Sequence, residues 1–153
     1  MGPAGAGKTT VGRRLAGALG VPFVDGDDFH TPEAIARMRA GHPLDDAARG
    51  PWLDRLHEVL RAHHERGIVL ACSALRRSYR SRLVGDLSGV AVLALVVAPD
   101  VLEARLATRT GHYAGPGLLA SQLETLELDG VTDLDGAAPV DDVVAEAQRV
   151  LEG

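Results

Sequence analysis

The chain has 153 residues, a length typical of one domain with a substantial buried core. Its formal net charge of −5, without a run of like charges, argues against nucleic acid as a main partner and favours small phosphorylated ligands. A single cysteine excludes an internal disulfide bond and fits a reducing cytoplasm, and no apolar run approaches the roughly twenty residues of a membrane span. These features predict a cytoplasmic protein without a membrane partner.

The chain opens with a glycine-rich segment, residues 2–9, that fits the pattern G-x-x-x-x-G-K-[ST]. Its glycines let successive backbone N–H groups turn toward one anion, and the helix that follows adds the positive end of its dipole. Lys8 would reach the β- and γ-phosphates, and the Thr9 hydroxyl would ligate Mg²⁺ beside them. Lys8 is also the only lysine among 16 basic residues. The segment predicts binding of a nucleoside triphosphate, and the alternative is a chance glycine-rich turn.

A phosphate loop of this type normally leaves the end of a β-strand, yet only Met1 precedes Gly2. Either the chain works without that strand or the strand is encoded upstream of Met1. We expect the second, so that the first strand is missing from this chain.

Hydrophobic periodicity predicts the other elements in alternating order. We expect strands at residues 21–24, 68–72, 90–98 and 131–134, and helices at 8–19, 32–40, from Pro51 onward, 76–87, 100–110, 118–128 and 140–151. This alternation predicts a single α/β domain over residues 1–153, a three-layer fold in which a parallel sheet carries helices on both faces.

Acidic side chains follow the first predicted strand, at Asp25, Asp27 and Asp28. The carboxyl ends of parallel strands line the crevice where open α/β sheets bind their ligands. Phosphoryl transfer needs one carboxylate near Mg²⁺ and another that accepts the proton of the attacking hydroxyl. We expect Asp27 to be that base and Asp25 to contact Mg²⁺ through water. The alternative is an ordinary Asp-Gly turn with solvated acids.

Arginines follow other predicted strands and helices. Arg49 would bind substrate if its segment folds over the crevice, whereas the nearby Asp46 is equally well explained as a helix cap. A run of arginines after the strand at 68–72 is either a solvated helix face or contains at least one substrate ligand (Arg76, Arg77, Arg80, Arg82). Cys72 ends an apolar run and is expected to be a small core residue.

A break rich in glycine and proline follows Arg109, and Arg105 lies one helical turn before it. Arginines on a closing segment can stabilise charge on a transferred phosphoryl group while the segment excludes water. We therefore expect a lid over about residues 105–120 that closes on ATP, with Arg105 and Arg109 contacting the nucleotide and His112 beside them.

Taken together, these stretches resemble the gluconokinase family of small phosphate-loop kinases. Seven stretches of the chain are similar to patterns of this family. They are residues 2–9 (G-x-S-G-S-G-K-[ST]), 25–30 (D-G-D-x-x-H), 37–44 (K-M-x-x-G-x-P-L), 48–53 (D-R-x-P-W-L), 71–80 (A-C-S-A-L-K-x-x-Y-R), 109–113 (R-x-G-H-F) and 121–127 (S-Q-F-x-T-L-E). The chain departs from them at several positions, among them Ala34 for Asn and Ala48 for Asp.

The resemblance implies an adenylate-kinase-like fold with strand order 2-3-1-4-5, ATP and Mg²⁺ as cofactors, and D-gluconate as acceptor. It implies catalytic roles for Lys8, Asp27 and Arg109, and metal contacts from Thr9 and Asp25. The implied nucleotide-binding residues are Gly2, Gly5, Ala6, Gly7, Lys8, Thr9, Thr10, Arg105 and Arg109. The implied substrate-binding residues are Asp27, His30, Arg49, Arg80, His112 and Gln122.

Three readings of function stay open at this point. The leading one is ATP-dependent phosphorylation of gluconate to 6-phosphogluconate. A shikimate-type or nucleoside-monophosphate kinase is the runner-up, although a nucleotide kinase needs an apolar slot for a second base and this chain offers arginine-rich segments. The third is a nucleotide-binding module without turnover. A homodimer is compatible with the sequence, which does not decide the oligomeric state.

Overall fold

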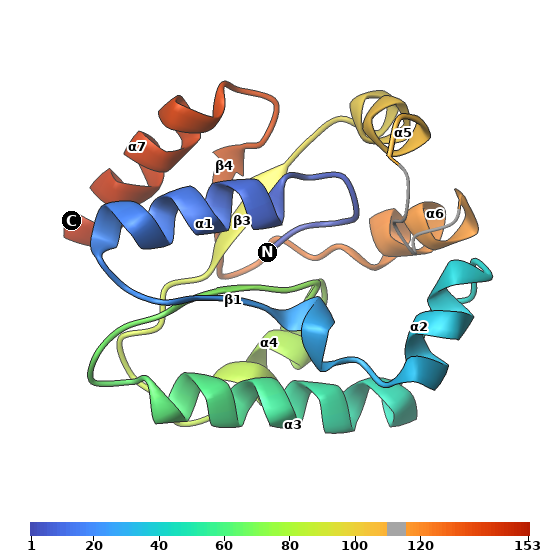
Figure 1. The fold of residues 1–153 in the computed structure, drawn as a ribbon, viewed down its shortest axis with the longest axis horizontal. Helices are drawn as coiled ribbons and strands as arrows, with labels where there is room; N and C mark the ends of the chain where they lie inside the picture. The colour runs from blue at the N-terminus through green and yellow to red at the C-terminus, as the bar shows by residue number, and fades with distance from the viewer. Residues whose placement is uncertain (110–115) are drawn as a thin grey trace.

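The computed structural model describes residues 1–109 and 116–153. Parallel strands are flanked by helices on both sides, as the alternating pattern predicts (Figure 1). The strands are β1 (Phe23–Asp25), β2 (Val69–Ala71), β3 (Leu93–Val96) and β4 (Thr132–Asp135). The helices are α1 (Lys8–Leu19), the short 3₁₀ helix η1 (Gly26–Phe29), α2 (Pro32–Arg39), α3 (Asp46–Ala62), α4 (Arg77–Val84), α5 (Pro99–Ala107), α6 (Pro116–Thr125) and α7 (Val140–Glu152).

The strands form two separate parallel pairs, β1 with β2 and β3 with β4. Met1 lies beside β3: its amino group donates to the carbonyl of Leu93, and the N–H of Leu95 donates to the carbonyl of Met1 at 2.9 Å. This is the pattern of a parallel ladder. The two outer pairs of the expected order 2-3-1-4-5 are present, as β1 with β2 and β3 with β4, and Met1 alone occupies the end of the central position, beside β3.

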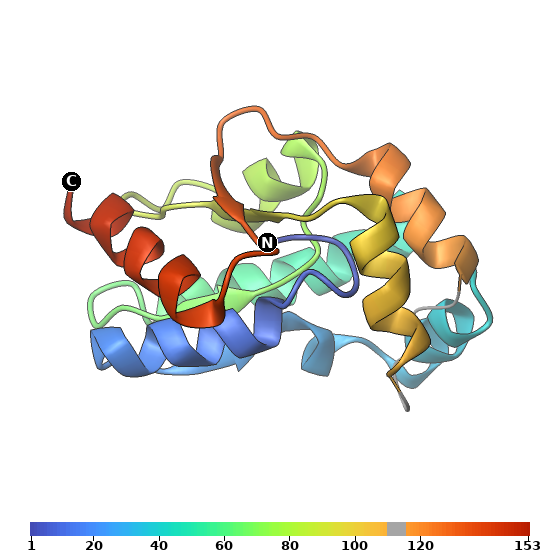
Figure 2. The same ribbon diagram turned by 90° about the horizontal axis from the view of Figure 1, so that it is seen from above.

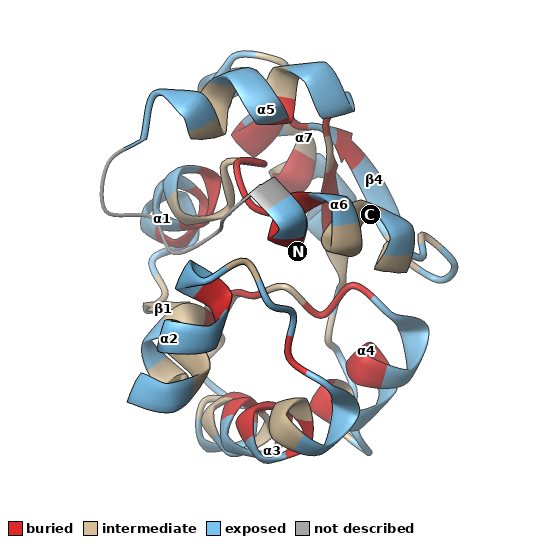
Figure 3. Cartoon of the chain, turned by 90° about the vertical axis from the view of Figure 1, so that its right-hand side faces the viewer, coloured by how far each residue is buried: buried red, intermediate tan, exposed pale blue. Residues whose placement is uncertain are grey.

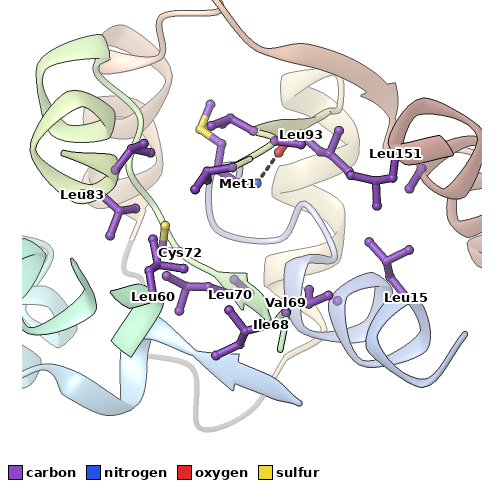
Figure 4. Close-up of a pocket in the computed structure, with 18 of the residues that line it drawn as sticks. Met1, Leu15, Leu60, Ile68, Val69, Leu70, Cys72, Leu83, Leu93 and Leu151 are labelled. Atoms are coloured by element: carbon purple, nitrogen blue, oxygen red, sulfur yellow. Dashed lines mark hydrogen bonds between the residues drawn. The ribbon is translucent and has the colours of Figure 1, made fainter. Parts of the chain in front are cut away.

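An apolar groove of about 310 Å³ separates the two strand pairs (Figure 4). Side chains from both pairs and from the flanking helices line it, including Met1, Leu15, Leu70, Leu93 and Leu151. The lining is mostly apolar, and no described strand pairing joins β2 to β3 across the groove. Strand edges without a partner leave N–H and C=O groups without ladder bonds. The groove thus marks the position that a continuous five-stranded sheet would fill.

Two apolar cores lie on either side of the strands. One joins α1 and α7 to β3 and β4, with Leu15, Leu95, Leu134 and Val143 among its buried members. The other joins α3 and α4 to β2 around Trp52. Cys72 belongs to this second core, which confirms that it is a small core residue. None of the helices in residues 1–109 and 116–153 is long and apolar enough to cross a membrane.

Helices α2, α5 and α6 gather at one end of the molecule, beyond the phosphate loop (Figures 1 and 2). Both α2 and α5 are mostly exposed and bury little of their surface (Figure 3). Residues 110–115 of the predicted lid lie outside the described residues, so the lid stays a prediction.

The start of α3 corrects one expectation. Pro51 was expected to open this helix, yet the helix begins at Asp46 and Pro51 lies inside it. Asp45 is the cap: its carboxylate accepts the N–H of Ala48 at 2.8 Å, which satisfies a donor that the first helical turn leaves without a partner. Helices α4, α5 and α6 each end three residues earlier than the periodicity suggested.

Candidate active site

The phosphate loop runs from Gly2 to Gly7 and leads directly into α1. Gly5 and Gly7 have φ of 83° and 93°, a left-handed conformation that other residues rarely adopt. The Nζ of Lys8 folds back over the loop and donates to the carbonyl of Pro3 at 2.9 Å. The sequence pattern therefore forms the tight glycine turn that it predicts, with the lysine side chain folded over it.

Burial lowers the pKa of Lys8, and the positive charge of Arg109 lowers it further. Asp27, Cys72 and Asp25 act in the opposite direction. A desolvated ammonium is well suited to bind a polyanion, because less water has to be removed from it on binding.

Thr9 and Asp25, both predicted to contact Mg²⁺, lie together. The hydroxyl of Thr9 donates to Oδ2 of Asp25 at 2.8 Å, and Oδ1 of Asp25 accepts the N–H of Asp27 at 3.1 Å. The described residues contain no group of three or more His, Cys, Asp or Glu side chains that could hold a metal ion. One carboxylate and one hydroxyl fit Mg²⁺, which keeps several waters and takes further ligands from substrate phosphates.

Asp27 and His30 lie on the turn that follows β1. The Nε2 of His30 is 3.7 Å from Oδ1 of Asp27, and its ring stacks on Trp52 with centroids 4.4 Å apart. Burial, together with Arg49 and Arg55, lowers the pKa of His30 to about 4, so this ring is neutral at pH 7. Its buried Nδ1 has no hydrogen-bond partner in the described structure.

Trp52 holds this turn in place. Its indole Nε1 donates to the carbonyl of Gly26 at 2.7 Å, and the whole side chain is buried. A methyl group at Gly26 would meet the carbonyl of Ala71 at 2.9 Å. The turn therefore packs tightly against β2 and α3, and this packing fixes where Asp25 and Asp27 lie.

Arg49, predicted to bind substrate, lies near both Trp52 and Tyr79. Its guanidinium carbon is 5.8 Å from the Trp52 ring and 4.9 Å from the ring of Tyr79. A cavity of about 340 Å³ opens beside it, and Gln122 also lines this cavity. Oε1 of Gln122 accepts the N–H of Ala4 at 2.7 Å, which links the cavity to the phosphate loop.

The structure gives other predicted site residues different surroundings. Arg105 donates to the carbonyls of Gly5 and Gly136 at 3.1 and 3.0 Å, so it braces the phosphate loop. Arg80 is buried, and its guanidinium donates to the carbonyls of Ala74, Leu75 and Asp129. These bonds favour a structural role for Arg80 over the predicted contact with substrate.

Two further predicted residues are exposed, and one is outside the described residues. Thr10 is exposed on the first turn of α1, and Arg109 is exposed at the end of the segment before residue 110. His112 lies outside the described residues.

Sequence reasoning missed the parts played by two aromatic residues. Trp52 and Tyr79 are both buried in the core around α3 and α4. Their rings also support His30 and Arg49, and the Tyr79 hydroxyl donates to Asp46 at 2.7 Å. Asp46 is thus a partner of Tyr79, while Asp45 caps the helix. Nothing in the linear sequence pairs residues so far apart.

Comparison with known proteins agrees with this geometry. A family model described as shikimate kinase matches residues 4–127. The gluconokinase of Gluconobacter oxydans (strain 621H) is 46% identical over 134 residues, covering 85% of this chain and 74% of that protein.

Two solved structures are also similar to the chain over nearly its whole length. A sugar kinase from Janibacter sp. HTCC2649, solved without ligand, superposes with a TM-score of 0.91 at 37% identity, covering 99% of this chain and 91% of that one. A gluconokinase from Sinorhizobium meliloti 1021 has a TM-score of 0.86 at 42% identity, with 99% and 89% covered. With the phosphate loop, the Asp25–His30 turn and these relatives in agreement, the chain belongs to the gluconokinase family of phosphate-loop kinases.

Proposed function

We propose that this protein is an ATP-dependent carbohydrate kinase that phosphorylates D-gluconate to 6-phospho-D-gluconate. The observation that carries the proposal is the contact of Thr9 with Asp25, which brings the phosphate loop to the turn that bears Asp27. A site for the nucleotide phosphates therefore adjoins a carboxylate able to accept a proton. Membership of the gluconokinase family supports gluconate as the acceptor.

In the proposed reaction the terminal hydroxyl of gluconate attacks the γ-phosphorus of ATP. A new phosphorus–oxygen bond forms, the bond to the oxygen that bridges the β- and γ-phosphates breaks, and ADP leaves. The proton of the hydroxyl passes to the carboxylate of Asp27. Lys8 stabilises charge on the phosphoryl oxygens, and backbone N–H groups of the phosphate loop hold the remaining phosphates.

Thr9 and Asp25 would hold Mg²⁺, Thr9 directly and Asp25 through water. When bound, the ion would neutralise part of the negative charge of the phosphates. Arg105 keeps the loop in its binding conformation through Gly5. The buried thiol of Cys72, whose pKa burial raises, takes no part, and it is compatible with the cytoplasmic location that the composition predicts.

A shikimate-type kinase is the second candidate, and the match to the family model of that description favours it. Shikimate and gluconate are both hydroxylated carboxylic acids, so one basic pocket could serve either. A nucleoside-monophosphate kinase is less compatible with the cavity, whose lining includes Asp45, Asp46, Arg49 and Arg76. A base needs an apolar slot, and these side chains are charged.

Release of ADP in a coupled assay, with gluconate, shikimate or AMP as acceptor, separates these candidates. We expect release that depends on gluconate and is near background with the other two. Lys8→Ala should lower the rate about 100-fold or more, as the loss of a charge contact made in the transition state does. A binding module without turnover would give no acceptor-dependent release at all. Dependence on shikimate alone would assign the second function.

A further inference from the structure

The proposed proton transfer uses Asp27, and the buried ring of His30 lies beside that carboxylate. The side chain of His30 is only 2% exposed, and it follows the turn η1 that carries Asp27. Burial, Arg49 and Arg55 lower the pKa of His30 to about 4, so the ring is neutral at pH 7. A neutral imidazole has one N–H donor and one acceptor nitrogen. The nitrogen that carries the proton therefore decides how the ring acts on Asp27.

Several contacts fix the ring of His30 in one orientation. The ring stacks on Trp52 with centroids 4.4 Å apart and planes inclined by 15°. The backbone N–H of His30 donates to the carbonyl of Asp27 at 3.3 Å. Arg55 donates to the carbonyl of Phe29, the residue before His30, at 2.8 and 3.2 Å. The ring is thus held by the same turn and the same helix that hold Asp27.

The surroundings of the two ring nitrogens assign the proton to Nε2. Nε2 is 3.7 Å from Oδ1 of Asp27, and an ionised carboxylate only accepts hydrogen bonds. Nδ1 is buried and has no hydrogen-bond partner in the described structure. A proton on Nδ1 would leave a buried N–H unpaired and would turn the lone pair of Nε2 toward a negative charge. A proton on Nε2 avoids both costs and directs the only donor of the ring at Asp27.

Restraint of one carboxylate oxygen matters for a base that has to meet a hydroxyl group. The side chain of Asp27 is 31% exposed, so an acceptor can reach it. A donor held against Oδ1 limits rotation of the carboxylate and so keeps the direction of its second oxygen. The 3.7 Å contact is longer than a hydrogen bond, as contacts between catalytic groups often are before substrate binds. Alignment is valuable here, because a misplacement of about 1 Å can lower a rate about 100-fold.

We propose that His30, as the Nε2–H tautomer, is a positioning residue whose N–H restrains the carboxylate of Asp27 toward the hydroxyl of the acceptor. This inference rests on the proposed function, because Asp27 is the base of that reaction. It gives His30 a role through Asp27 in place of the direct contact with substrate that the family resemblance implies.

Two substitutions separate the N–H donor of His30 from its ring. His30→Phe keeps a ring on Trp52 and removes the donor, whereas His30→Gln keeps an N–H donor of similar reach and removes the ring. We expect the single-turnover rate with gluconate to fall about tenfold or more in His30→Phe and to stay within about threefold of the wild type in His30→Gln. The dissociation constant for ATP should change little in either variant, and melting temperatures check that both are folded.

A purely structural role of the ring predicts the opposite order. His30→Phe would then keep its rate and His30→Gln would lose it, and this result would overturn the proposal. The matched control is His57→Gln, because His57 is a half-buried histidine of α3 whose Nδ1 lies 2.9 Å from the carbonyl of Leu83. This variant should lower the melting temperature and leave the rate unchanged.

A double-mutant cycle tests whether His30 acts through Asp27. In the Asp27→Asn background the base is already absent, so adding His30→Phe should change the residual rate less than about twofold. Effects of the two substitutions that multiply would show that His30 acts independently of Asp27 and would overturn the positioning role.

Heteronuclear NMR of the histidine side chains provides a readout that does not depend on turnover. We expect His30 at pH 7 to be the Nε2–H tautomer, and its signals are identified by their absence in His30→Phe. In Asp27→Ala the resonance of the Nε2 proton should move or broaden, because this proton loses its partner. A proton on Nδ1 in the wild type, or an Nε2 proton that Asp27→Ala leaves unchanged, would overturn the proposal.

Failure of the proposed function gives a different result. The Nε2–H tautomer with its dependence on Asp27, but without any release of ADP in the presence of gluconate, would support the pairing of His30 with Asp27 and contradict the kinase assignment. Turnover of gluconate by a wild type that has the proton on Nδ1 would support the kinase assignment and overturn the positioning role.

Discussion

At the scale of single residues, Asp27 is the group on which the proposed proton transfer depends. It lies on η1, two residues after Asp25, and the N–H of Asp27 donates to the carboxylate of Asp25. Asp27→Asn keeps the size of the side chain and removes the base. We expect kcat to fall about 100-fold or more, as when a general base is lost, while the dissociation constant for ATP changes little.

Asp28→Asn is the matched control for Asp27→Asn, because Asp28 is the next residue and is exposed. It should keep nearly full activity. If Asp27→Asn weakened ATP binding and turnover in equal proportion, Asp27 would be a binding residue and not the base.

His30 should make the stability of the protein depend on pH. Its pKa is about 4 in the folded protein, against an ordinary value of 6.5 in the unfolded chain. As the pH falls, His30 therefore binds a proton at a higher pH in the unfolded chain than in the folded protein. The contribution of neutral His30 to stability is fully present above pH 6.5 and is lost as the pH falls toward 4.

His30→Phe keeps a ring on Trp52 and removes this titration. Between pH 7 and pH 5 the wild type should lose about 2 kcal/mol more unfolding free energy than His30→Phe. Urea denaturation at the two pH values measures this difference. Parallel losses in the two proteins would show that His30 is not buried as a neutral ring.

At the scale of elements, the turn η1 depends on a glycine that has no room for a side chain. A Cβ at Gly26 would lie 2.9 Å from the carbonyl of Ala71, 3.0 Å from Cys72 and 3.1 Å from Leu56. We expect Gly26→Ala to cost about 1–3 kcal/mol of unfolding free energy and to reduce activity, because the turn carries Asp25 and Asp27.

Gly17→Ala is the control for the glycine substitution. Gly17 lies within α1, and an added Cβ there meets nothing within 4 Å. This variant should gain about 0.5–1 kcal/mol, as alanine generally does over glycine in a helix. Equal effects of the two substitutions on the thermal melting temperature would contradict the packing described for η1.

The sequence predicted the elements that carry local signals. The phosphate loop, α1 and the acidic turn after β1 are specified by neighbouring residues, and the structure has them where the pattern placed them. The predicted start of α3 was wrong because two local signals compete there. Proline is favoured at the first position of a helix, which pointed to Pro51, whereas the structure uses Asp45 as the cap.

The sequence did not predict the partners of Arg80 and Tyr79, because contacts between distant segments determine them. Arg80 looked like a substrate ligand, yet the carbonyls that it meets come from Ala74, Leu75 and Asp129, and the last of these is far away in the sequence. The same holds for Tyr79, whose partners Asp46 and Arg49 belong to α3. No pattern within one segment contains such pairings.

At the scale of the whole molecule, the groove between β2 and β3 leaves the two strand pairs unjoined. Met1 already pairs with β3 in parallel, so an added segment in front of it would continue along the groove. An apolar extension of about five residues, the usual strand length, should pair with both neighbouring strands and bury apolar surface. We expect a gain of at least about 1 kcal/mol, or about 2–4 °C in melting temperature for a domain of this size.

A polar extension of the same length is the control, because serine and aspartate would not enter the groove that Leu70 and Leu93 help to line. It should leave the melting temperature unchanged or lower it. If the apolar and polar extensions had the same effect, the groove would not accept a strand.

The central claim, transfer of a phosphoryl group from ATP to gluconate, is tested most directly by phosphorus NMR of the reaction with gluconate, ATP and Mg²⁺. We predict one phosphate-ester signal that grows in proportion to ADP and is split into a triplet, because the terminal carbon of gluconate carries two hydrogens. ADP accompanied only by inorganic phosphate, or an ester signal split into a doublet by a single hydrogen, would contradict the proposed function.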